Sequence, residues 1–216
     1  RLKAGLVSGA VALPDTSNGF VVKKNVFSGK AFANISLNTD VKIIGLSKNA
    51  FGLKEIAGNA ATEDFSPTLN NEDFSINVTS VDKARDKVTI ADAEIVVSGG
   101  RGMKGPENWG MLEELADTLG AATACSKPVS DMGWRPHSEH VGQTGKPVAA
   151  NLYIAVGISG AIQHLAGINA SKTKLVINND PEAPFLKAAD YAVVGDAFDI
   201  VPRLNEKLKE FKAKNA

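Results

Sequence analysis

The 20 glycines of this 216-residue chain are unevenly distributed, and this distribution constrains the fold more than any other feature. Twelve lie between Gly99 and Gly167, whereas the first 94 residues contain only seven. In the glycine-rich part, short apolar runs lead into glycine loops, and helical patterns follow. Strands alternating with helices predict a parallel sheet with helices on both faces, and ligands of such sheets bind beyond the carboxyl ends of the strands. Most of the glycine loops fall at these ends.

Two kinds of pattern support this α/β prediction. Apolar runs indicate strands at residues 94–97, 121–125, 152–156, 173–177 and 191–194. Apolar residues at helical spacing indicate one helix that ends at Gly120 and a second helix close to the C-terminus. The apolar face of the first carries Leu112, Leu115, Ala116 and Leu119, and that of the second carries Val201, Leu204, Leu208 and Phe211.

The first part of the chain is predicted to be β-rich. Alternating residues 31–37, a turn-type triplet and the apolar run 41–46 indicate a β-meander, and residues 74–79 also have a strand pattern. Residues 60–74 are polar and indicate a linker or long loop. We therefore expect residues 1–80 to form a β-rich part of a first domain and residues 81–216 to form a second, α/β domain.

The composition narrows the class of protein. Lys and Arg together number 24, as do Asp and Glu, so the net charge gives no reason to expect a nucleic-acid or anionic-membrane partner. The single cysteine, Cys125, excludes an internal disulfide and a cysteine-ligated iron–sulfur cluster within this chain. No apolar run approaches the roughly 20 residues of a membrane span, and the first residues do not resemble a signal peptide. We expect a soluble protein of a reducing compartment.

The first glycine loop, residues 100–105, matches the G-x-G-x-x-G dinucleotide fingerprint between a strand and a helix. The acidic residue that would bind a ribose at the end of the next strand is missing, because Ser126 and Lys127 stand there. An ordinary NAD-binding domain is therefore disfavoured, and a tight strand-to-helix turn also fits. Arg101 places a cation in this loop, where it suits a phosphate or an electron-rich ring.

The second loop, Val141-Gly142-Gln143-Thr144-Gly145-Lys146, resembles a phosphate-binding loop only superficially. The P-loop spacing requires a glycine where His140 stands and a hydroxyl residue where Pro147 stands. The segment still offers backbone N–H groups, a hydroxyl and an amide to a polar ligand. A glycine-rich surface turn is an equally good interpretation.

The third loop, residues 157–164, is the sharpest local signal. A buried strand runs into Gly157-Ile158-Ser159-Gly160, and a helix follows. Free N–H groups and the helix dipole favour an anion there, most naturally a pyrophosphate. His164 would either donate to a ligand carbonyl or be a packed structural residue. The G-x-S-x-G spacing of a nucleophile elbow is absent.

Two later strand ends also carry polar side chains. Asn178 and Asp196 would suit the hydroxyls of a ribose or the edge of adenine, although such residues also make turns. A metal site at His137, Glu139 and His140 is a disfavoured alternative.

Taken together, residues 97–102, 141–145 and 152–167 closely resemble the α-subunit of electron transfer flavoprotein. Asn178, residues 180–184, residues 189–191 and Asp196 extend the match in the family's order and spacing over about residues 91–212. The resemblance implies a Rossmann-like, FAD-binding domain related to the nicotinamide-binding domains of transhydrogenases. It also implies that residues 1–80 are the β-rich remnant of a first α/β domain whose earlier part is absent here.

The resemblance implies roles for particular residues as well. Arg101 would lie by the flavin, and Ser126 would help to hold it. Gln143 and Thr144, in the loop that starts with Val141 and Gly142, would bind the ribityl–flavin region, with the Thr144 hydroxyl near N5. The third glycine loop and the start of the helix after it would hold the cofactor through Ser159, Gly160, Ala161, Ile162, Gln163 and His164.

Within that segment, His164 would lie toward the flavin O2, where a donor and a nearby cation stabilise an anionic flavin. Asn178 and Asp196 would contact the adenosine end. Lys127 stands where the family commonly has arginine. Lysine keeps the positive charge but loses the planar surface that stacks on an aromatic ring.

The resemblance finally implies an electron carrier without substrate chemistry of its own, in a heterodimer with a β-subunit. Its donors would be flavin dehydrogenases such as the acyl-CoA dehydrogenases of fatty acid β-oxidation, and its acceptor a quinone oxidoreductase or another redox protein. A bacterial cytoplasm is favoured over a mitochondrial matrix, without membrane insertion. The alternatives are an NAD- or FAD-dependent oxidoreductase, although no acid–base pair for a substrate is evident, and a non-redox nucleotide-binding module.

Overall fold

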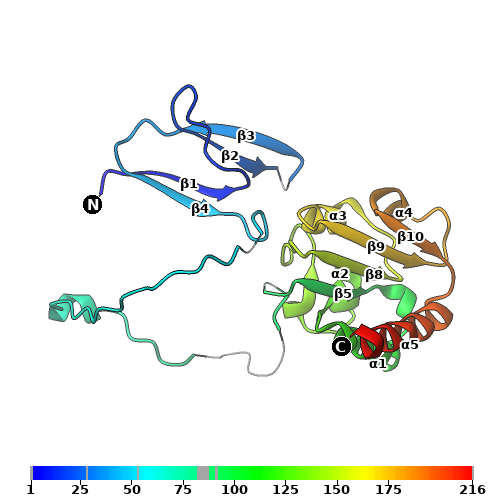
Figure 1. Ribbon diagram of the computed structural model, residues 1–216. Coiled ribbons are helices and arrows are strands. Elements are labelled where there is room, and N and C mark those ends of the chain that lie inside the picture. Colours follow the sequence, from blue (N-terminus) through cyan, green and yellow to red (C-terminus); the bar gives the residue numbers. More distant parts are fainter. Residues whose placement is uncertain (1, 28, 53, 82–87, 91, 216) are drawn as a thin grey trace.

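A computed structural model describes residues 2–27, 29–52, 54–81, 88–90 and 92–215. These residues contain two separate sheets, which Figure 1 shows joined by a long extended segment. The first sheet comprises β1 (Gly5–Ala10), β2 (Val21–Val26), β3 (Ala31–Ser36) and β4 (Lys42–Leu46). The second comprises β5 (Ile95–Gly99), β6 (Ala122–Ser126), β7 (His140–Val141), β8 (Leu152–Val156), β9 (Thr173–Asn178) and β10 (Tyr191–Val194).

The six-stranded sheet has the order β10-β9-β8-β5-β6-β7, and every strand pair in it is parallel. The chain starts in the middle with β5, proceeds outward to β7, and then returns to the other side of β5 with β8. This is the doubly wound order of a Rossmann-like fold, in which the reversal opens a crevice at the carboxyl ends of the two central strands. The predicted fold class is confirmed, and the crevice lies between β5 and β8.

Helices cover both faces of this sheet (Figure 1). They are α1 (Gly110–Leu119), α2 (Lys127–Asp131), α3 (Ile162–Ile168), α4 (Pro184–Ala188) and α5 (Ala197–Asn215). Short 3₁₀ turns occur at η1 (Asn71–Phe74), η2 (Arg101–Met103), η3 (Pro106–Asn108) and η4 (His137–Glu139). The predicted end of α1 is confirmed, because Gly120 adopts the left-handed conformation that closes the helix.

Successive residues of the central strands enter opposite cores because side chains alternate across a strand. Val96 and Tyr153 pack on the side of α3 and α4, whereas Val97 and Ile154 pack on the side of α1 and α5. Both faces of the central strands β5 and β8 are buried, and this explains why these strands appear in the sequence as nearly continuous apolar runs, whereas the edge strand β10 is exposed.

The β-rich prediction for the first part is confirmed, but the simple meander is not. Strands β1, β2 and β3 pair antiparallel in sequence order, whereas β4 pairs in parallel with β1 on the far side of the sheet. The chain after β3 therefore crosses over instead of making a hairpin. Thr39 holds this crossing in place, because its hydroxyl accepts a hydrogen bond from the Gly5 amide and donates one to the Val41 carbonyl.

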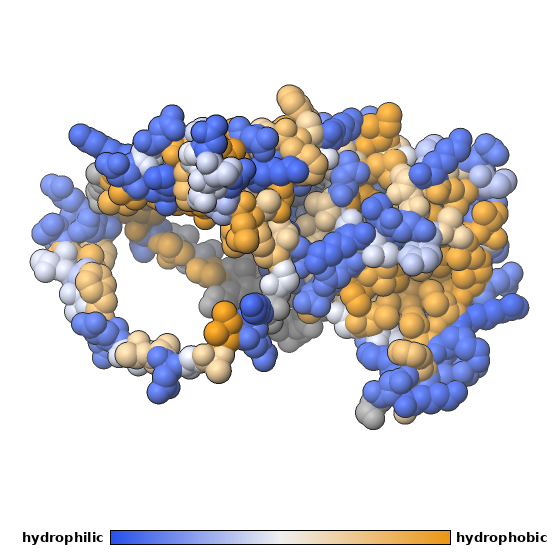
Figure 2. All heavy atoms as spheres, turned by 45° about the horizontal axis from the view of Figure 1, so that its top comes forward, coloured by the Kyte–Doolittle hydropathy of each residue, from blue (hydrophilic) through white to orange (hydrophobic). Residues whose placement is uncertain are grey.

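The segment after β4 leads to the second sheet, and every described residue from Lys54 to Val81 is exposed. Figure 2 shows it as an open arc. The predicted loop over residues 60–74 has regular structure only in η1. The strand predicted at residues 74–79 is wrong: Ile76 is 85% exposed, and an alternating pattern makes no strand without a neighbour to pair with. The predicted division near residue 80 lies in this segment and stays a prediction.

None of the helices among the described residues is long and apolar enough to cross a membrane.

Candidate functional site

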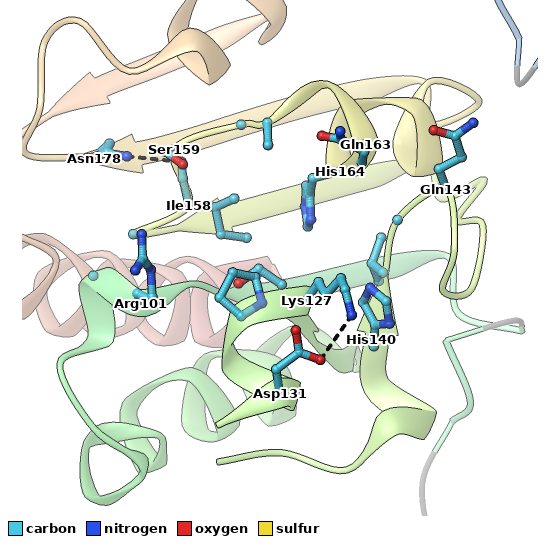
Figure 3. Close-up of a pocket in the computed structure, with 18 of the residues that line it drawn as sticks. Arg101, Lys127, Asp131, His140, Gln143, Ile158, Ser159, Gln163, His164 and Asn178 are labelled. Atoms are coloured by element: carbon cyan, nitrogen blue, oxygen red, sulfur yellow. Dashed lines mark hydrogen bonds and ion pairs between the residues drawn. The ribbon is translucent and has the colours of Figure 1, made fainter. Parts of the chain in front are cut away.

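A cavity of about 630 Å³ lies at the carboxyl edge of the six-stranded sheet (Figure 3). Its walls come from the loops after β5, β6, β7, β8 and β9, so the crevice between β5 and β8 is its centre. A volume of this size suits a small molecule or cofactor. The predicted position of ligand binding, beyond the strand ends, coincides with this cavity.

The loops after β5 and β8 touch through their backbones. The Gly102 amide donates to the Gly157 carbonyl at 3.0 Å, and the Gly100 amide donates to the Val156 carbonyl at 2.8 Å. A Cβ atom on Gly102 would lie 2.6 Å from the Gly157 Cα, which is too close for any side chain. Glycine at this crossing therefore keeps bare backbone at the cavity wall.

A second close approach holds the loop after β7 against α3. The Gln143 amide donates to the Gln163 carbonyl at 2.8 Å. A Cβ atom on Gly167 would lie 2.6 Å from the Gly142 Cα, so the helix and the loop pack without a side chain between them. This contact positions the backbone of residues 141–144 along the cavity.

Two cations at the cavity differ in their surroundings. Arg101 is exposed, and its guanidinium forms no ion pair or hydrogen bond with any residue that the structure describes. Lys127, the first residue of α2, forms an ion pair with Asp131 one turn later at 3.1 Å. Asp131 also lines the cavity, so it offsets part of the charge that Lys127 brings.

Two buried histidines contribute to the same wall. Burial lowers the pKa of His140, and the nearby charge of Lys127 lowers it further. His164 is also buried, and the Tyr153 hydroxyl lies 2.9 Å from its Nε2 atom. Burial lowers the pKa of His164 to about 4, assisted by His140 and partly opposed by the Val141 backbone. The His164 imidazole is therefore neutral at pH 7.

No acceptor in the described part of the chain meets the buried Nδ1 of His164 at hydrogen-bonding distance and angle, although the Val141 backbone lies close enough to the ring to raise its pKa. Buried polar groups normally have a partner, so an orphan at a cavity wall marks the place where a ligand group would complete the arrangement. Figure 3 shows the His164 side chain pointing from α3 into the pocket.

The amide of Asn178 is engaged within the protein. It donates to the Ile158 carbonyl at 3.0 Å and accepts from the Asp180 amide at 3.0 Å. Asp196 accepts a hydrogen bond from the Phe198 amide at the start of α5 and forms an ion pair with Lys104 at 3.7 Å. Asn178 borders the cavity, whereas Asp196 does not line it.

All but two of the residues expected to bind a cofactor line the cavity. The exceptions are Asp196 and Ile162, and the Ile162 side chain is 68% exposed. The lining residues are Arg101, Ser126, Lys127, Val141, Gly142, Gln143, Thr144, Ser159, Gly160, Ala161, Gln163, His164 and Asn178. The cavity also includes residues that were not expected to bind, namely Gly102, Pro128, Asp131, His140, Gly157, Ile158 and Asp180.

Most of the unexpected residues are sequence neighbours of expected ones. Asp131 differs, since it reaches the cavity one helical turn beyond Lys127. The sequence did contain a signal for Asp131, because oppositely charged residues four positions apart on a helix lie on the same face.

The structure also bears on two other sequence patterns, the dinucleotide fingerprint and the disfavoured metal site. The 3₁₀ turn η2 lies within the glycine loop at residues 100–105, and a second 3₁₀ turn, η3, separates this loop from α1. The loop therefore does not lead directly into a helix as the dinucleotide fingerprint requires. In the disfavoured metal trio, Arg135 binds both carboxylate oxygens of Glu139. No group of three potential metal ligands is present among the described residues.

The fold and the cavity define a doubly wound α/β protein with a cofactor site at its strand-order reversal. Residues 89–169 match the family model described as the electron transfer flavoprotein FAD-binding domain. The chain is 39% identical over 218 residues to the electron transfer flavoprotein subunit alpha of Bacillus subtilis (strain 168), covering 97% of this chain and 65% of that protein.

Two other relatives agree with this match. The subunit alpha of Syntrophomonas wolfei is 37% identical over 211 residues, covering 97% of this chain and 67% of that protein. The mitochondrial subunit alpha of Dictyostelium discoideum is 42% identical over 198 residues, covering 88% of this chain and 56% of that protein. The chain belongs to the electron transfer flavoprotein α-subunit family, and it spans 65% of the length of the Bacillus relative.

The matched domain identifies FAD as the cofactor, and the residues present fit it. The backbone crossing of Gly102 and Gly157 leaves room for an extended ligand against the sheet edge. The orphan Nδ1 of His164 can donate to a carbonyl oxygen, and Arg101 supplies a cation without a partner in the described structure. Carbonyl oxygens and phosphates are groups that FAD presents.

Proposed function

We propose that this chain carries the FAD site of an electron transfer flavoprotein and acts as its α-subunit, in a heterodimer with a β-subunit. When bound, FAD supplies the one- and two-electron redox chemistry. The protein would transfer electrons between other redox proteins and perform no substrate chemistry of its own. The observation that carries the proposal is that residues from five separate loops, expected to bind FAD, line one cavity.

In this proposal, residues from different walls of the cavity contact different parts of the flavin. Arg101 and Lys127 place positive charge beside the isoalloxazine ring, and Ser126 helps to hold it. Gln143 and Thr144 bind the ribityl–flavin region, with the Thr144 hydroxyl near N5. His164 lies toward O2. A fixed donor and fixed cations stabilise negative charge on a ring in a site that excludes water, and they thereby raise its potential.

The loop after β8 would hold the pyrophosphate region, through backbone groups of residues 159–163. Asn178 would contribute at the adenosine end mainly by shaping the loop, because its amide is already bonded to Ile158 and Asp180. Asp196 would contact the adenosine only from the cavity rim, and its ion pair with Lys104 competes with that contact. Residues 81–216 would form the FAD domain, and residues 1–80 part of a first domain.

The partners that we propose follow from the family. Electrons would come from flavin dehydrogenases, such as the acyl-CoA dehydrogenases of fatty acid β-oxidation, and would pass to a quinone oxidoreductase or another acceptor. We propose a bacterial cytoplasm as the location. The neutral charge balance supports a protein partner over nucleic acid.

An absorption experiment tests the proposal. The purified chain, mixed with the β-subunit of a relative and with FAD, should give the flavin spectrum of a bound cofactor. That spectrum should bleach when a reduced acyl-CoA dehydrogenase is added. Turnover of a small-molecule substrate by the complex alone would favour an oxidoreductase instead. Failure to bind FAD with the β-subunit present would contradict the main proposal and favour a module without redox function.

The replacement Lys127→Arg should raise the one-electron potential of bound FAD. Arginine keeps the charge and adds a planar surface that stacks on an aromatic ring. A cation–π gain of about 0.5–2 kcal/mol corresponds to roughly 20–90 mV for one electron. Spectroelectrochemical titration measures the shift, and the matched control is Lys187→Arg, at an exposed position of α4. An unchanged or lowered potential in Lys127→Arg would count against the stacking role.

A further inference from the structure

A buried tyrosine lies behind the cavity wall, in contact with the histidine that forms part of that wall. The Tyr153 hydroxyl, on the central strand β8, is 2.9 Å from His164 Nε2. Tyr153 is fully buried and does not itself line the cavity. Its ring lies parallel to that of Phe185 with centroids 6.5 Å apart, and Phe185 also contacts His164 at 6.0 Å. Packing therefore holds both ring planes.

The hydrogen bond between these side chains has a definite direction. Burial raises the pKa of Tyr153, so its hydroxyl keeps the proton and requires an acceptor. Ser98, on the neighbouring strand β5, lies near Tyr153 and partly offsets the effect of burial on its pKa. However, the buried Ser98 hydroxyl meets the distance and angle limits of a hydrogen bond with no residue that the structure describes. The acceptor is therefore His164 Nε2, and Tyr153 is the donor.

This direction determines where the imidazole carries its proton. A neutral histidine has one N–H group and one acceptor nitrogen. Because Nε2 accepts from Tyr153, the proton of His164 resides on Nδ1. That atom is the orphan described above, without a hydrogen-bond partner in the described part of the chain. In Figure 3 the His164 side chain points into the space beside Lys127 and His140.

We propose that Tyr153 is a positioning residue that holds His164 in the Nδ1–H tautomer, so that a buried N–H donor remains for a carbonyl oxygen of the isoalloxazine ring. The second half of this inference rests on the proposed FAD site, whereas the first half concerns the protein alone. Tyr153 would act on the cofactor only through the tautomer and orientation of His164, as outer hydrogen-bond partners of histidine ligands do.

The first test is nitrogen NMR of the FAD-free protein labelled with ¹⁵N-histidine. The chain has three histidines, and the His164 signals are those lost in His164→Asn. We expect the Nδ1–H pattern in the unmodified protein. In Tyr153→Phe the ratio of tautomers should shift by roughly fivefold toward Nε2–H, as for a hydrogen bond of ordinary net strength. The other tyrosine of the chain is exposed, so Tyr191→Phe is the matched control and should leave the ratio unchanged.

The second test is the potential of bound FAD in a double-mutant cycle. Tyr153→Phe should lower the one-electron potential when His164 is present and leave it unchanged in a His164→Asn background. Equal shifts in both backgrounds would overturn the positioning role, as would an Nε2–H pattern in the unmodified protein. If FAD does not bind at all, the proposed function fails, and the NMR result still decides whether Tyr153 sets the tautomer.

Discussion

Replacing Gly167 by alanine should destabilise the FAD domain by about 2 kcal/mol and weaken FAD binding roughly tenfold. The new methyl group would lie 2.6 Å from the Gly142 Cα, 2.7 Å from its carbonyl carbon and 2.8 Å from its nitrogen. All three are backbone atoms, so neither side can rotate away. Overpacking of this kind costs about 1–3 kcal/mol, and alanine recovers up to about 1 kcal/mol as the better helix former.

The loss of affinity follows from the atoms that must move. To relieve the clash, α3 and the loop after β7 must separate, and this loop carries Gln143 and Thr144. Its anchor is the hydrogen bond from the Gln143 amide to the Gln163 carbonyl, at 2.8 Å. Weakening the anchor misplaces several groups that would bind the cofactor, and a loss of about 1.4 kcal/mol corresponds to a tenfold change in affinity.

Urea unfolding followed by tryptophan fluorescence measures the stability, because Trp109 is buried in the core that includes α1 and α5, and Trp134, the other tryptophan, packs against it. The matched control is Gly110→Ala, another helical glycine, around which an added methyl group meets nothing within 4 Å. That variant should be unchanged or slightly more stable. Equal effects of the two replacements would show that the contact between Gly167 and Gly142 does not limit stability.

The fold was predictable where a local signal in the sequence determines the structure. Residues 152–156 and 191–194 were predicted at their observed bounds, and Gly120 correctly marked the end of α1. The run at 152–156 is buried on both faces in a parallel sheet, and Gly120 adopts a positive φ at a helix end. These are local constraints with strong sequence signals.

The errors arose where a distant part of the chain decides the outcome. Residues 74–79 alternate like a strand but have no neighbouring strand. Strand β4 was expected beside β3 and instead pairs with β1, because strand order is not encoded in the hydrophobic pattern. The helix after β5 starts at Gly110, later than the fingerprint suggested, since two 3₁₀ turns intervene.

In the candidate site, too, local features were predictable and contacts with distant parts of the chain were not. Residues that reach the cavity through backbone loops were predictable, because glycines mark the ends of parallel strands. The bonding of side chains was not predictable. Asp196 binds the start of its own helix, and His164 binds a tyrosine 11 residues earlier on β8. Such pairings depend on which strand face and which helix meet in space, and single-sequence patterns do not specify this.

Lowering the pH from 7 to 4 should remove about 3 kcal/mol of stability from the FAD-free domain through His164 alone. Burial lowers the pKa of His164 in the folded protein to about 4, whereas the unfolded chain has the ordinary value of 6.5. Between these values the unfolded state binds more protons than the folded state, so stability falls as the pH falls. The contribution is complete above pH 6.5 and is lost by about pH 4.

Two replacements that remove the titrating group isolate the contribution of His164 to the pH dependence of stability. His164→Asn and His164→Gln differ in size, so their stabilities at pH 7 should differ, yet both should lose about 3 kcal/mol less than the unmodified protein between pH 7 and pH 4. Acidic groups elsewhere titrate in all three proteins and cancel in the comparison. Urea unfolding at half-unit pH steps measures the curves. If the three curves run parallel, burial does not lower the pKa of His164. The direction proposed for the hydrogen bond from Tyr153 would then lose its support, because a ring with protons on both nitrogens has no acceptor for the tyrosine hydroxyl.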